Sequence, residues 1–558
     1  ADSIRSMWRY RHTVDGSIQE CWLTFADDTN VVGSMIADEA RGRVYWTSEA
    51  HEPRTSFWSA AVSGSGPYPV TAYQLGVPLP KAAGTVSAVG GVGSNVTRSY
   101  TYTFVNDLGE ESGPAPASAL VTNKVDATWT ISGMDTAPAN GGAVTSRTNV
   151  PGGTVVRLAV TNTKWITVGT RLLIAGVAQA SVFGLGRDIN GQHKVLAVDT
   201  VGNTIDIALP PQNAIIVAGT WALEYPFYTG GLKMRIYHTS GTGAAFLFLA
   251  EISPAASYNH TTPASGEPIP TLNSLPPPPK LKCIIAMPNG CLCGINENEV
   301  CFSEPYLPYS WPIANRYSFV GKGVAVGSSG NSAIVLTEGF PIMLTGSDPE
   351  SMSMTTMETY APCVSKRGAV NVGGGILYPS HDGLWLATAS GAVIKSRGLF
   401  RMDEWKALAP ETFEAEFHDG QYYAVHTPVG GKKQMLVLDI VELDSVVTVD
   451  DTADAIARND YDGSLYTAKG GNIYKFDASD EGRYFSEWTS VEVQADQPRN
   501  FSHAQVHADW RQAVPIDTSI YDANVALIAA GADAVNGYMI GSEFNDFEIN
   551  GSNLQHYE

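Results

Sequence analysis

The amino-acid sequence predicts an all-β fold, with a β-propeller of about six blades at its centre. The 558 residues include 55 Gly, 32 Pro and 10% aromatic side chains, a composition typical of turn-rich β proteins. One pattern also recurs along the chain: a tight turn with glycine, an alternating apolar strand, a second turn and another apolar strand. Units of this kind at a period of about 40 to 50 residues are typical of propeller blades.

The turn glycines of this repeat are spaced by 40, 53, 37 and 43 residues, and they are Gly290, Gly330, Gly383, Gly420 and Gly463. Asn-Gly and Asp-Gly pairs supply the positive φ angles that a two-residue hairpin turn requires. A further copy occurs upstream, around residues 40–60. Because a closed ring removes exposed sheet edges, we expect residues 1–61 to contribute a blade to the main propeller of residues 276–480.

Residues 62–275 interrupt the repeat and have a different pattern. Aromatic and polar residues alternate strictly in residues 99–104, which predicts a half-buried strand. Strands of the same style return after residue 230. The sequence therefore predicts an inserted fibronectin-III-like sandwich, split into residues 62–124 and 223–275.

Residues 125–222 lie inside this split sandwich and contain strand patterns of their own, so we expect a small inserted β-barrel. Four consecutive prolines at 276–279 predict a stiff spacer that returns the chain to the propeller. Residues 481–558 carry further strand patterns and are expected to form a C-terminal β region.

The charge balance disfavours a surface that grips nucleic acid. The chain has 35 basic and 56 acidic side chains, a formal net charge of −21, whereas affinity for phosphate backbones comes from Lys and Arg. No apolar run approaches the roughly 18–20 residues of a membrane span, and residues 1–5 lack the apolar core of a signal peptide. We therefore expect a soluble protein.

No catalytic, cofactor-binding or metal-binding residue is predicted. Cys291 and Cys293 suggest a zinc site, but residues i and i+2 of a strand share one face, and no CxxC or histidine pair completes a ligand set. We expect buried reduced thiols, and hence assembly in the cytosol. The pairs His381-Asp382 and His418-Asp419 look like catalytic dyads. Both fall in predicted hairpin turns, at the same position of consecutive blades, so we expect turn roles and no enzyme activity.

Several segments resemble tail proteins of short-tailed bacteriophages. They are residues 301–308 (CFSEPYLP) with Trp311-Pro312, residues 336–346 (LTEGFPIMLTG), residues 363–367 leading to 378–384, residues 398–405 (GLFRMDEW), and residues 102–112 (YTFVNDLGEES). Together they make the chain similar to the nozzle family, also called tail tubular protein B, over most of residues 34–480.

The resemblance implies a structural virion protein: a homohexameric tube at the distal end of the tail, below an adaptor ring, assembled in the host cytoplasm. Such a tube retains the genome and lets phage DNA pass on ejection, without sequence-specific binding. Tail fibres or spikes and the host cell surface are the further partners it implies. An acidic channel would repel the phosphates. Our candidate channel-lining acids are Glu110, Glu111, Asp450 and Asp451.

Two other functions remain open at this stage. A propeller-based carbohydrate-binding protein or polysaccharide depolymerase would need clustered aromatic residues and a carboxylate pair at one propeller mouth. An extracellular adhesin could also combine a propeller with fibronectin-like modules, although the lack of a signal peptide counts against it.

Overall fold

The structure is a computed structural model, and the protein is almost entirely β. It forms two compact units, Ala1–Ala478 and Ser479–Glu558. The residues that the structure describes are 3–36, 39–151, 154–177, 179–180, 189–209, 215–216, 218–239, 245–260, 266–441, 446–449, 452–476, 503–507, 514–515, 527–528, 538–539 and 546–550.

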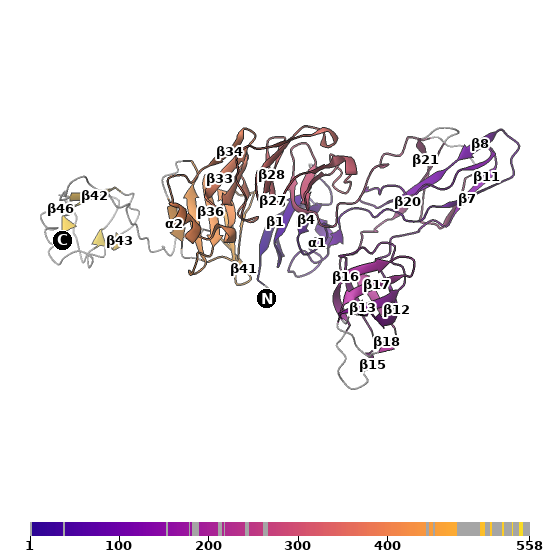
Figure 1. Cartoon of the computed structure of the whole chain (residues 1–558), viewed down its shortest axis with the longest axis horizontal. Coiled ribbons are helices and arrows are strands. Elements are labelled where there is room, and N and C mark those ends of the chain that lie inside the picture. The colour runs from indigo at the N-terminus through magenta and orange to yellow at the C-terminus, as the bar shows by residue number, and fades with distance from the viewer. Residues whose placement is uncertain are drawn as a thin grey trace. The chain divides into compact units, whose positions relative to one another are not determined.

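The first unit contains a β-propeller made from both ends of its chain (Figure 1). It comprises a two-stranded hairpin, five four-stranded sheets and one three-stranded sheet, all antiparallel, which we call blades I to VII. Blade I consists of β1 (Ser6–Val14) and β2 (Ser17–Phe25). Blade II consists of β3 (Thr29–Gly33), β4 (Val44–Ser48), β5 (Arg54–Ser56) and β6 (Tyr73–Gln74). Blade III consists of β23 (Lys282–Ala286), β24 (Leu292–Asn296), β25 (Glu299–Phe302) and β26 (Arg316–Ser318).

Blades IV to VII complete the ring. Blade IV consists of β27 (Gly323–Ser329), β28 (Ser332–Thr337), β29 (Ile342–Thr345) and β30 (Ser353–Thr356), and blade V of β31 (Val370–Asn371), β32 (Ile376–Ser380), β33 (Gly383–Thr388) and β34 (Gly391–Ile394). Blade VI consists of β35 (Glu414–His418), β36 (Gln421–His426), β37 (Gln434–Asp439) and β38 (Val446–Val449). Blade VII consists of β39 (Ala455–Arg458), β40 (Leu465–Lys469) and β41 (Asn472–Lys475).

Buried apolar clusters between neighbouring blades show that the ring is closed. Each of the seven adjacent pairs, from I–II round to VII–I, shares one such cluster. The hairpin of blade I buries Tyr10 and Leu23 against Trp46 of blade II, and Met7 against Ala455 of blade VII. The N-terminal segment thus joins the ring to its last blade, as expected, but it supplies two blades where one was expected, and blade II extends to Gln74, beyond the expected boundary at residue 61. The ring therefore has seven members against an expectation of about six.

Every blade turns between its first two strands through a glycine with positive φ, between 56° and 81°. These glycines are Gly16, Gly42, Gly290, Gly330, Gly373, Gly420 and Gly463. In blade V the equivalent glycine is Gly373, not Gly383, which begins the third strand. With Gly373 in place, the spacings from Gly290 onward become 40, 43, 47 and 43 residues, so the uneven repeat in the sequence came from choosing the wrong turn.

The insertion contains a β-sandwich with one shared core, in which Tyr102, Trp129 and Ile236 are fully buried. Its strands are β7 (Thr85–Val89), β8 (Asn95–Arg98), β9 (Tyr100–Val105), β10 (Val121–Lys124), β11 (Thr128–Ser132), β20 (Lys233–Thr239), β21 (Phe246–Ile252) and β22 (Ser257–His260). Strand β11 pairs with β7 and β22, so residues 128–132 belong to the sandwich and not to the barrel that was expected to begin at residue 125.

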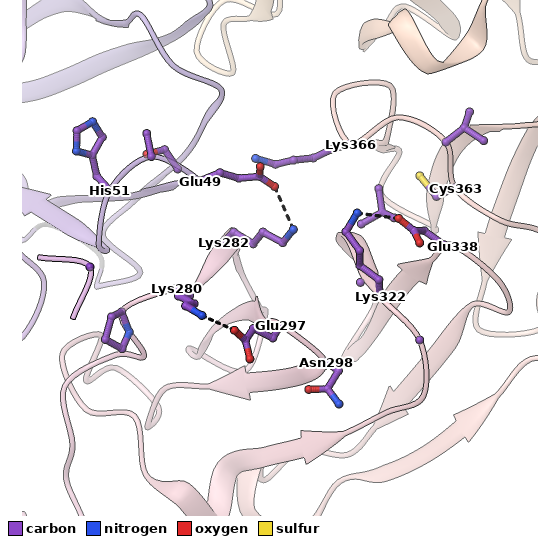
Figure 2. A pocket seen from close by; sticks show the side chains of 18 of the residues that line it. Glu49, His51, Lys280, Lys282, Glu297, Asn298, Lys322, Glu338, Cys363 and Lys366 are labelled. Carbon is purple, nitrogen blue, oxygen red and sulfur yellow. Dashed lines mark hydrogen bonds and ion pairs between the residues drawn. The ribbon is translucent and has the colours of Figure 1, made fainter. Parts of the chain in front are cut away.

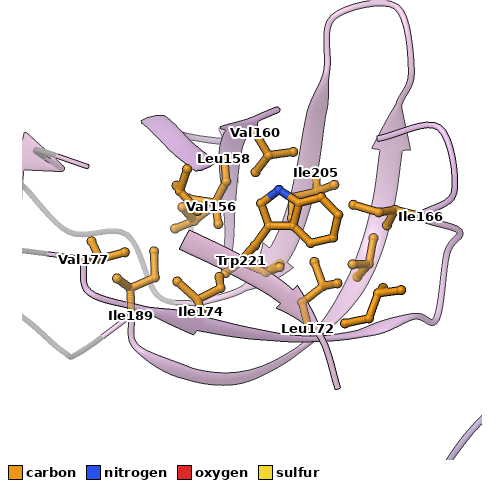
Figure 3. Packing of buried hydrophobic residues seen from close by; sticks show 14 residues of the cluster. Val156, Leu158, Val160, Ile166, Leu172, Ile174, Val177, Ile189, Ile205 and Trp221 are labelled. Carbon is orange, nitrogen blue, oxygen red and sulfur yellow. The ribbon is translucent and has the colours of Figure 1, made fainter. Parts of the chain in front are cut away.

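A closed six-stranded barrel lies within the sandwich sequence (Figure 3). Its strands, in order round the barrel, are β12 (Gly141–Asn149), β13 (Val155–Val160), β17 (Thr204–Ala208), β16 (Gly191–Asp199), β14 (Arg171–Ala175) and β19 (Gly219–Leu223). Alternate residues of these strands point inward, and Trp221 fills the centre among Val, Leu and Ile side chains. Strands β15 (Gln179–Ala180) and β18 (Ile215–Ile216) pair separately.

Helical segments in the described part of the chain are short. They are α1 (Trp58–Ala61), α2 (Met402–Ala407) and the 3₁₀ turns Ile313–Asn315, Pro349–Ser351 and Pro410–Thr412. None of the described helices is long and apolar enough to cross a membrane. The second unit contains β42 (His503–His507), β43 (Val514–Pro515), β44 (Leu527–Ile528), β45 (Tyr538–Met539) and β46 (Asp546–Asn550), paired in two small sheets.

Candidate functional site

A cavity of about 1140 Å³ opens at one mouth of the propeller (Figure 2). The turns between the second and third strands of blades II to V form part of its wall. The segments that lead into the first strands of blades III to VI form the rest of the propeller side. Val168, Gly169 and Lys194 of the inserted barrel also line it.

Five lysines line this cavity, one third of the fifteen in the chain. Four come from the propeller and Lys194 comes from the barrel. The propeller lysines form ion pairs with Nζ-to-carboxylate distances of 2.5 Å for Lys280–Glu297, 3.0 Å for Lys282–Glu49, 2.8 Å for Lys322–Glu338 and 3.1 Å for Lys366–Asp28. Five glutamates line the same cavity, Glu49, Glu52, Glu297, Glu338 and Glu411, so its lining is balanced in formal charge although the chain carries −21.

The lysines differ in depth. The side chains of Lys282 and Lys366 are 17% and 12% exposed, whereas those of Lys280 and Lys322 extend into solvent. Figure 2 shows the two deep ammonium groups pointing toward the carboxylate of Glu49. That glutamate lies in the turn after β4, and its side chain is 64% exposed. Two inner cations therefore face an anion that is itself accessible to solvent.

Lys366, the less exposed of these two lysines, also belongs to a network of charged residues that lie at or just before the first strands of several blades. Lys366 and Arg367, just before blade V, both approach Asp28, just before blade II, at 3.1 and 3.6 Å. Arg367 donates a hydrogen bond to the carbonyl oxygen of Arg5, and Arg5 pairs with Glu414 of β35 at 3.1 Å. Lys366 is consequently held from below by the propeller framework and not by the rim of the cavity.

Two residues that suggest chemistry also line the cavity. The Cys363 thiol is buried, and burial raises its pKa to about 12, so it stays protonated and is a poor nucleophile. Its Sγ donates to the carbonyl oxygen of Ser365 at 3.3 Å. His381 reaches the cavity from the turn between β32 and β33.

Only the first of the two His-Asp pairs lies wholly in a two-residue turn, as expected, and the two pairs do not hold the same position in their blades. His381-Asp382 connects the second and third strands of blade V, whereas His418-Asp419 ends the first strand of blade VI and begins its first turn. The Asp382 carboxylate accepts a hydrogen bond from Nε1 of Trp385 at 2.8 Å. Asp419 has a positive φ of 48°, as a hairpin turn of this kind requires.

The structure corrects the expectation that Glu110 and Glu111 line a channel, because both are buried, at 2% and 3% exposure. The loop after β9 folds back on itself: the Asn106 side chain accepts hydrogen bonds from backbone N–H groups of the loop and turns both glutamates inward. Glu110 pairs with Arg43 of the propeller at 3.3 Å, and burial raises the pKa of its carboxyl above the ordinary value.

The neighbouring carboxylate has three partners within the sandwich. Glu111 accepts hydrogen bonds from Thr103 Oγ1 at 2.7 Å, Tyr237 Oη at 2.6 Å and Arg235 Nη1 at 2.6 Å. Glu111 is thus a structural centre of the sandwich. The other two candidates, Asp450 and Asp451, lie outside the described residues.

The cysteines of blade III follow the alternation expected from the sequence. Cys291 and Cys293 pack in the cluster between blades III and IV, while Leu292 between them packs against blade II. Burial raises the pKa of the Cys291 thiol to about 12 and holds the pKa of the Cys293 thiol well above its ordinary value. These thiols belong to the core between blades.

Sequence reasoning missed a histidine that connects the propeller to the insertion. His51 Nε2 lies 3.1 Å from Asp27 Oδ2, and its Nδ1 lies 3.5 Å from Glu224 Oε2, at the end of the barrel. The ring also meets Tyr225 edge-on at 5.4 Å. Because these residues are far apart in sequence, no local pattern could have indicated the contact. Likewise, the five cavity lysines are scattered from residue 194 to residue 366.

No protein-family model matches the chain, and no curated protein matches it. Two crystal structures of BBS1N in complex with ARL6DN are similar at 11% sequence identity, one soaked with mercury (TM-score 0.25) and one with lead (TM-score 0.23). Each match covers 54% of this chain and 89% of the other.

Proposed function

We propose that this chain is a structural virion protein, the nozzle of a short phage tail. Six copies would form a channel that retains the genome and lets DNA pass into the host on ejection. The observation that carries the proposal is the resemblance of five segments to that family. Three of the segments each contribute a buried residue to the framework: Trp311 packs between blades II and III, Trp405 packs between blades V and VI, and Glu111 is the buried centre of the sandwich.

Charge supports the same function. Six copies at −21 each carry −126, and a like-charged wall would keep duplex DNA from adhering as it passes. The acids that line such a channel would be exposed carboxylates other than Glu110 and Glu111, because both of these are buried. The mouth cavity favours the nozzle over a sugar-binding propeller, because no Phe, Tyr or Trp is among the described residues that line it.

The oligomeric state tests the proposal. The purified chain, mixed with the adaptor ring of the same tail, should form particles with six-fold symmetry and a central hole in negative-stain top views. Native mass spectrometry should give six copies per particle. Any other symmetry, or failure to bind an adaptor ring that is itself assembled, would overturn the nozzle proposal.

A further inference from the structure

We propose that the cavity at the propeller mouth binds a phosphate-bearing ligand through Lys282 and Lys366. This site is independent of the channel, because it lies on each single chain. The inference starts from two lysines that line the cavity and come from different blades. Lys282 begins β23 of blade III, and Lys366 precedes β31 of blade V.

These two cations are held in place before any ligand arrives. A lysine side chain in solvent has many conformers, and ordering it on binding costs free energy. Here both stems are packed, with 17% and 12% exposure, and Lys366 is fixed from below by its 3.1 Å contact with Asp28. The Nζ atom of Lys366 is buried and has no further hydrogen-bond partner among the described residues. It therefore has donor capacity left for a ligand oxygen.

Glu49 occupies the position that we assign to the ligand. Its carboxylate lies 3.0 Å from Lys282 Nζ, with Lys366 also directed at it (Figure 2). Because the side chain is 64% exposed, this pair is a weak surface ion pair that water and other anions can replace. A phosphate monoester has a higher charge and three terminal oxygens, so it can accept from both ammonium groups at once.

The rest of the cavity has room for what carries the phosphate. Its volume of about 1140 Å³ lies slightly above the range of roughly 300–1,000 Å³ that is ordinary for ligand pockets, and it far exceeds the volume of a phosphate group. The rim pairs Lys280–Glu297 and Lys322–Glu338 are exposed, and their carboxylates can accept hydrogen bonds from hydroxyl groups. A phosphorylated sugar and a nucleotide share this chemistry.

Calorimetric titration of the full-length chain at low salt tests the site, first with pyrophosphate as the probe. Binding should be saturable with one site per chain. Lys282→Gln and Lys366→Gln should each weaken it at least tenfold, whereas Glu49→Gln should strengthen it by removing the competing carboxylate. Lys475→Gln, an exposed lysine of blade VII, is the matched control and should bind as the parent does. Glucose 6-phosphate and AMP, titrated in parallel, show whether the site prefers a phosphorylated sugar or a nucleotide.

Opposite effects of the Glu49 and lysine variants are the signature of the site, because general damage to the fold would weaken binding in both. Each variant is first compared with the parent by thermal unfolding without ligand. If Lys366→Gln does not fold, the pair Lys282→Gln and Glu49→Gln still decides the outcome. No saturable binding, weaker binding in Glu49→Gln, or an equal loss in Lys475→Gln would overturn the proposal. None of these results depends on whether the chain forms hexamers.

Discussion

Glu111 and Glu251 both accept a hydrogen bond from Arg235, at 2.6 and 3.0 Å, but their side chains are 4% and 30% exposed. Removing Glu111 leaves the buried hydroxyls of Thr103 and Tyr237 without their acceptor, whereas Arg235, whose side chain is 34% exposed, keeps Glu251 as a partner. At about 1–3 kcal/mol for each orphaned buried hydroxyl, we expect Glu111→Ala to lower the free energy of unfolding by about 2–6 kcal/mol. Glu251→Ala should lower it by no more than about 1 kcal/mol. Denaturant unfolding of both variants checks this, and equal losses would contradict it.

A second residue gives the protein a pH dependence. Burial raises the pKa of Glu416, on β35, to about 7, and Arg367 and Arg458 only partly oppose this effect. The folded state therefore keeps a proton that the unfolded chain releases near pH 4.5, its ordinary pKa. The stability that this proton contributes is complete below pH 4.5 and is lost as the pH rises through 7.

Glu416→Gln removes that titration. The advantage of the variant over the parent in free energy of unfolding should grow between pH 5 and pH 8 and then level off. Glu358→Gln, at an exposed position, is the control and should leave the pH profile unchanged. A parallel pH profile for Glu416→Gln and the parent would show that Glu416 is not the titrating group.

At the scale of secondary-structure elements, the first turn of blade V offers a matched pair of glycines. Gly373 has a φ of +76°, whereas Gly374 lies outside the left-handed region, and an added Cβ would meet nothing within 4 Å at either position. Gly373→Ala should therefore cost about 1 kcal/mol of stability from backbone strain alone. Gly374→Ala should be neutral or slightly stabilising. Thermal unfolding of the two variants separates strain from crowding, and a larger loss at Gly374 would refute this assignment.

These turns also show what the sequence could and could not predict. Hairpin turns and alternating strands are local signals, so the blades and the inserted modules were predictable from residues such as Gly290 and Gly463. The residues next to a glycine do not show which of the turns of a blade it occupies. Gly383 was therefore assigned to the first turn of blade V, although it begins the third strand. The burial of Glu111 was unpredictable for the same reason, since Arg235 lies 124 residues away. The lysine cavity forms only after blades II to VI and the barrel come together.

At the scale of the whole molecule, the closed ring makes the blades depend on one another. Leu23 of blade I is fully buried against blade II, while Ile18 of the same hairpin is 56% exposed. Leu23→Ala should lower the free energy of unfolding by about 2–5 kcal/mol, and Ile18→Ala by less than about 0.5 kcal/mol. Hydrogen exchange should show faster opening in blade IV as well, across the ring. Protection lost only in blades I and II would mean that the ring is not cooperative.

Closure by blade I has a consequence for biosynthesis. One apolar face of the hairpin packs against blade VII, whose last strand ends at Lys475, about 450 residues after Phe25. At translation rates of about 5–20 residues per second, roughly 20–90 s separate the appearance of the two partners on the ribosome. Throughout that interval the apolar side chain of Met7 lacks the blade VII residues that bury it in the folded protein. The sandwich and the barrel together form one continuous stretch of sequence, from β7 to β22, so they can already fold. Nascent chains stalled before residue 455 should therefore recruit chaperones at their N-terminal hairpin.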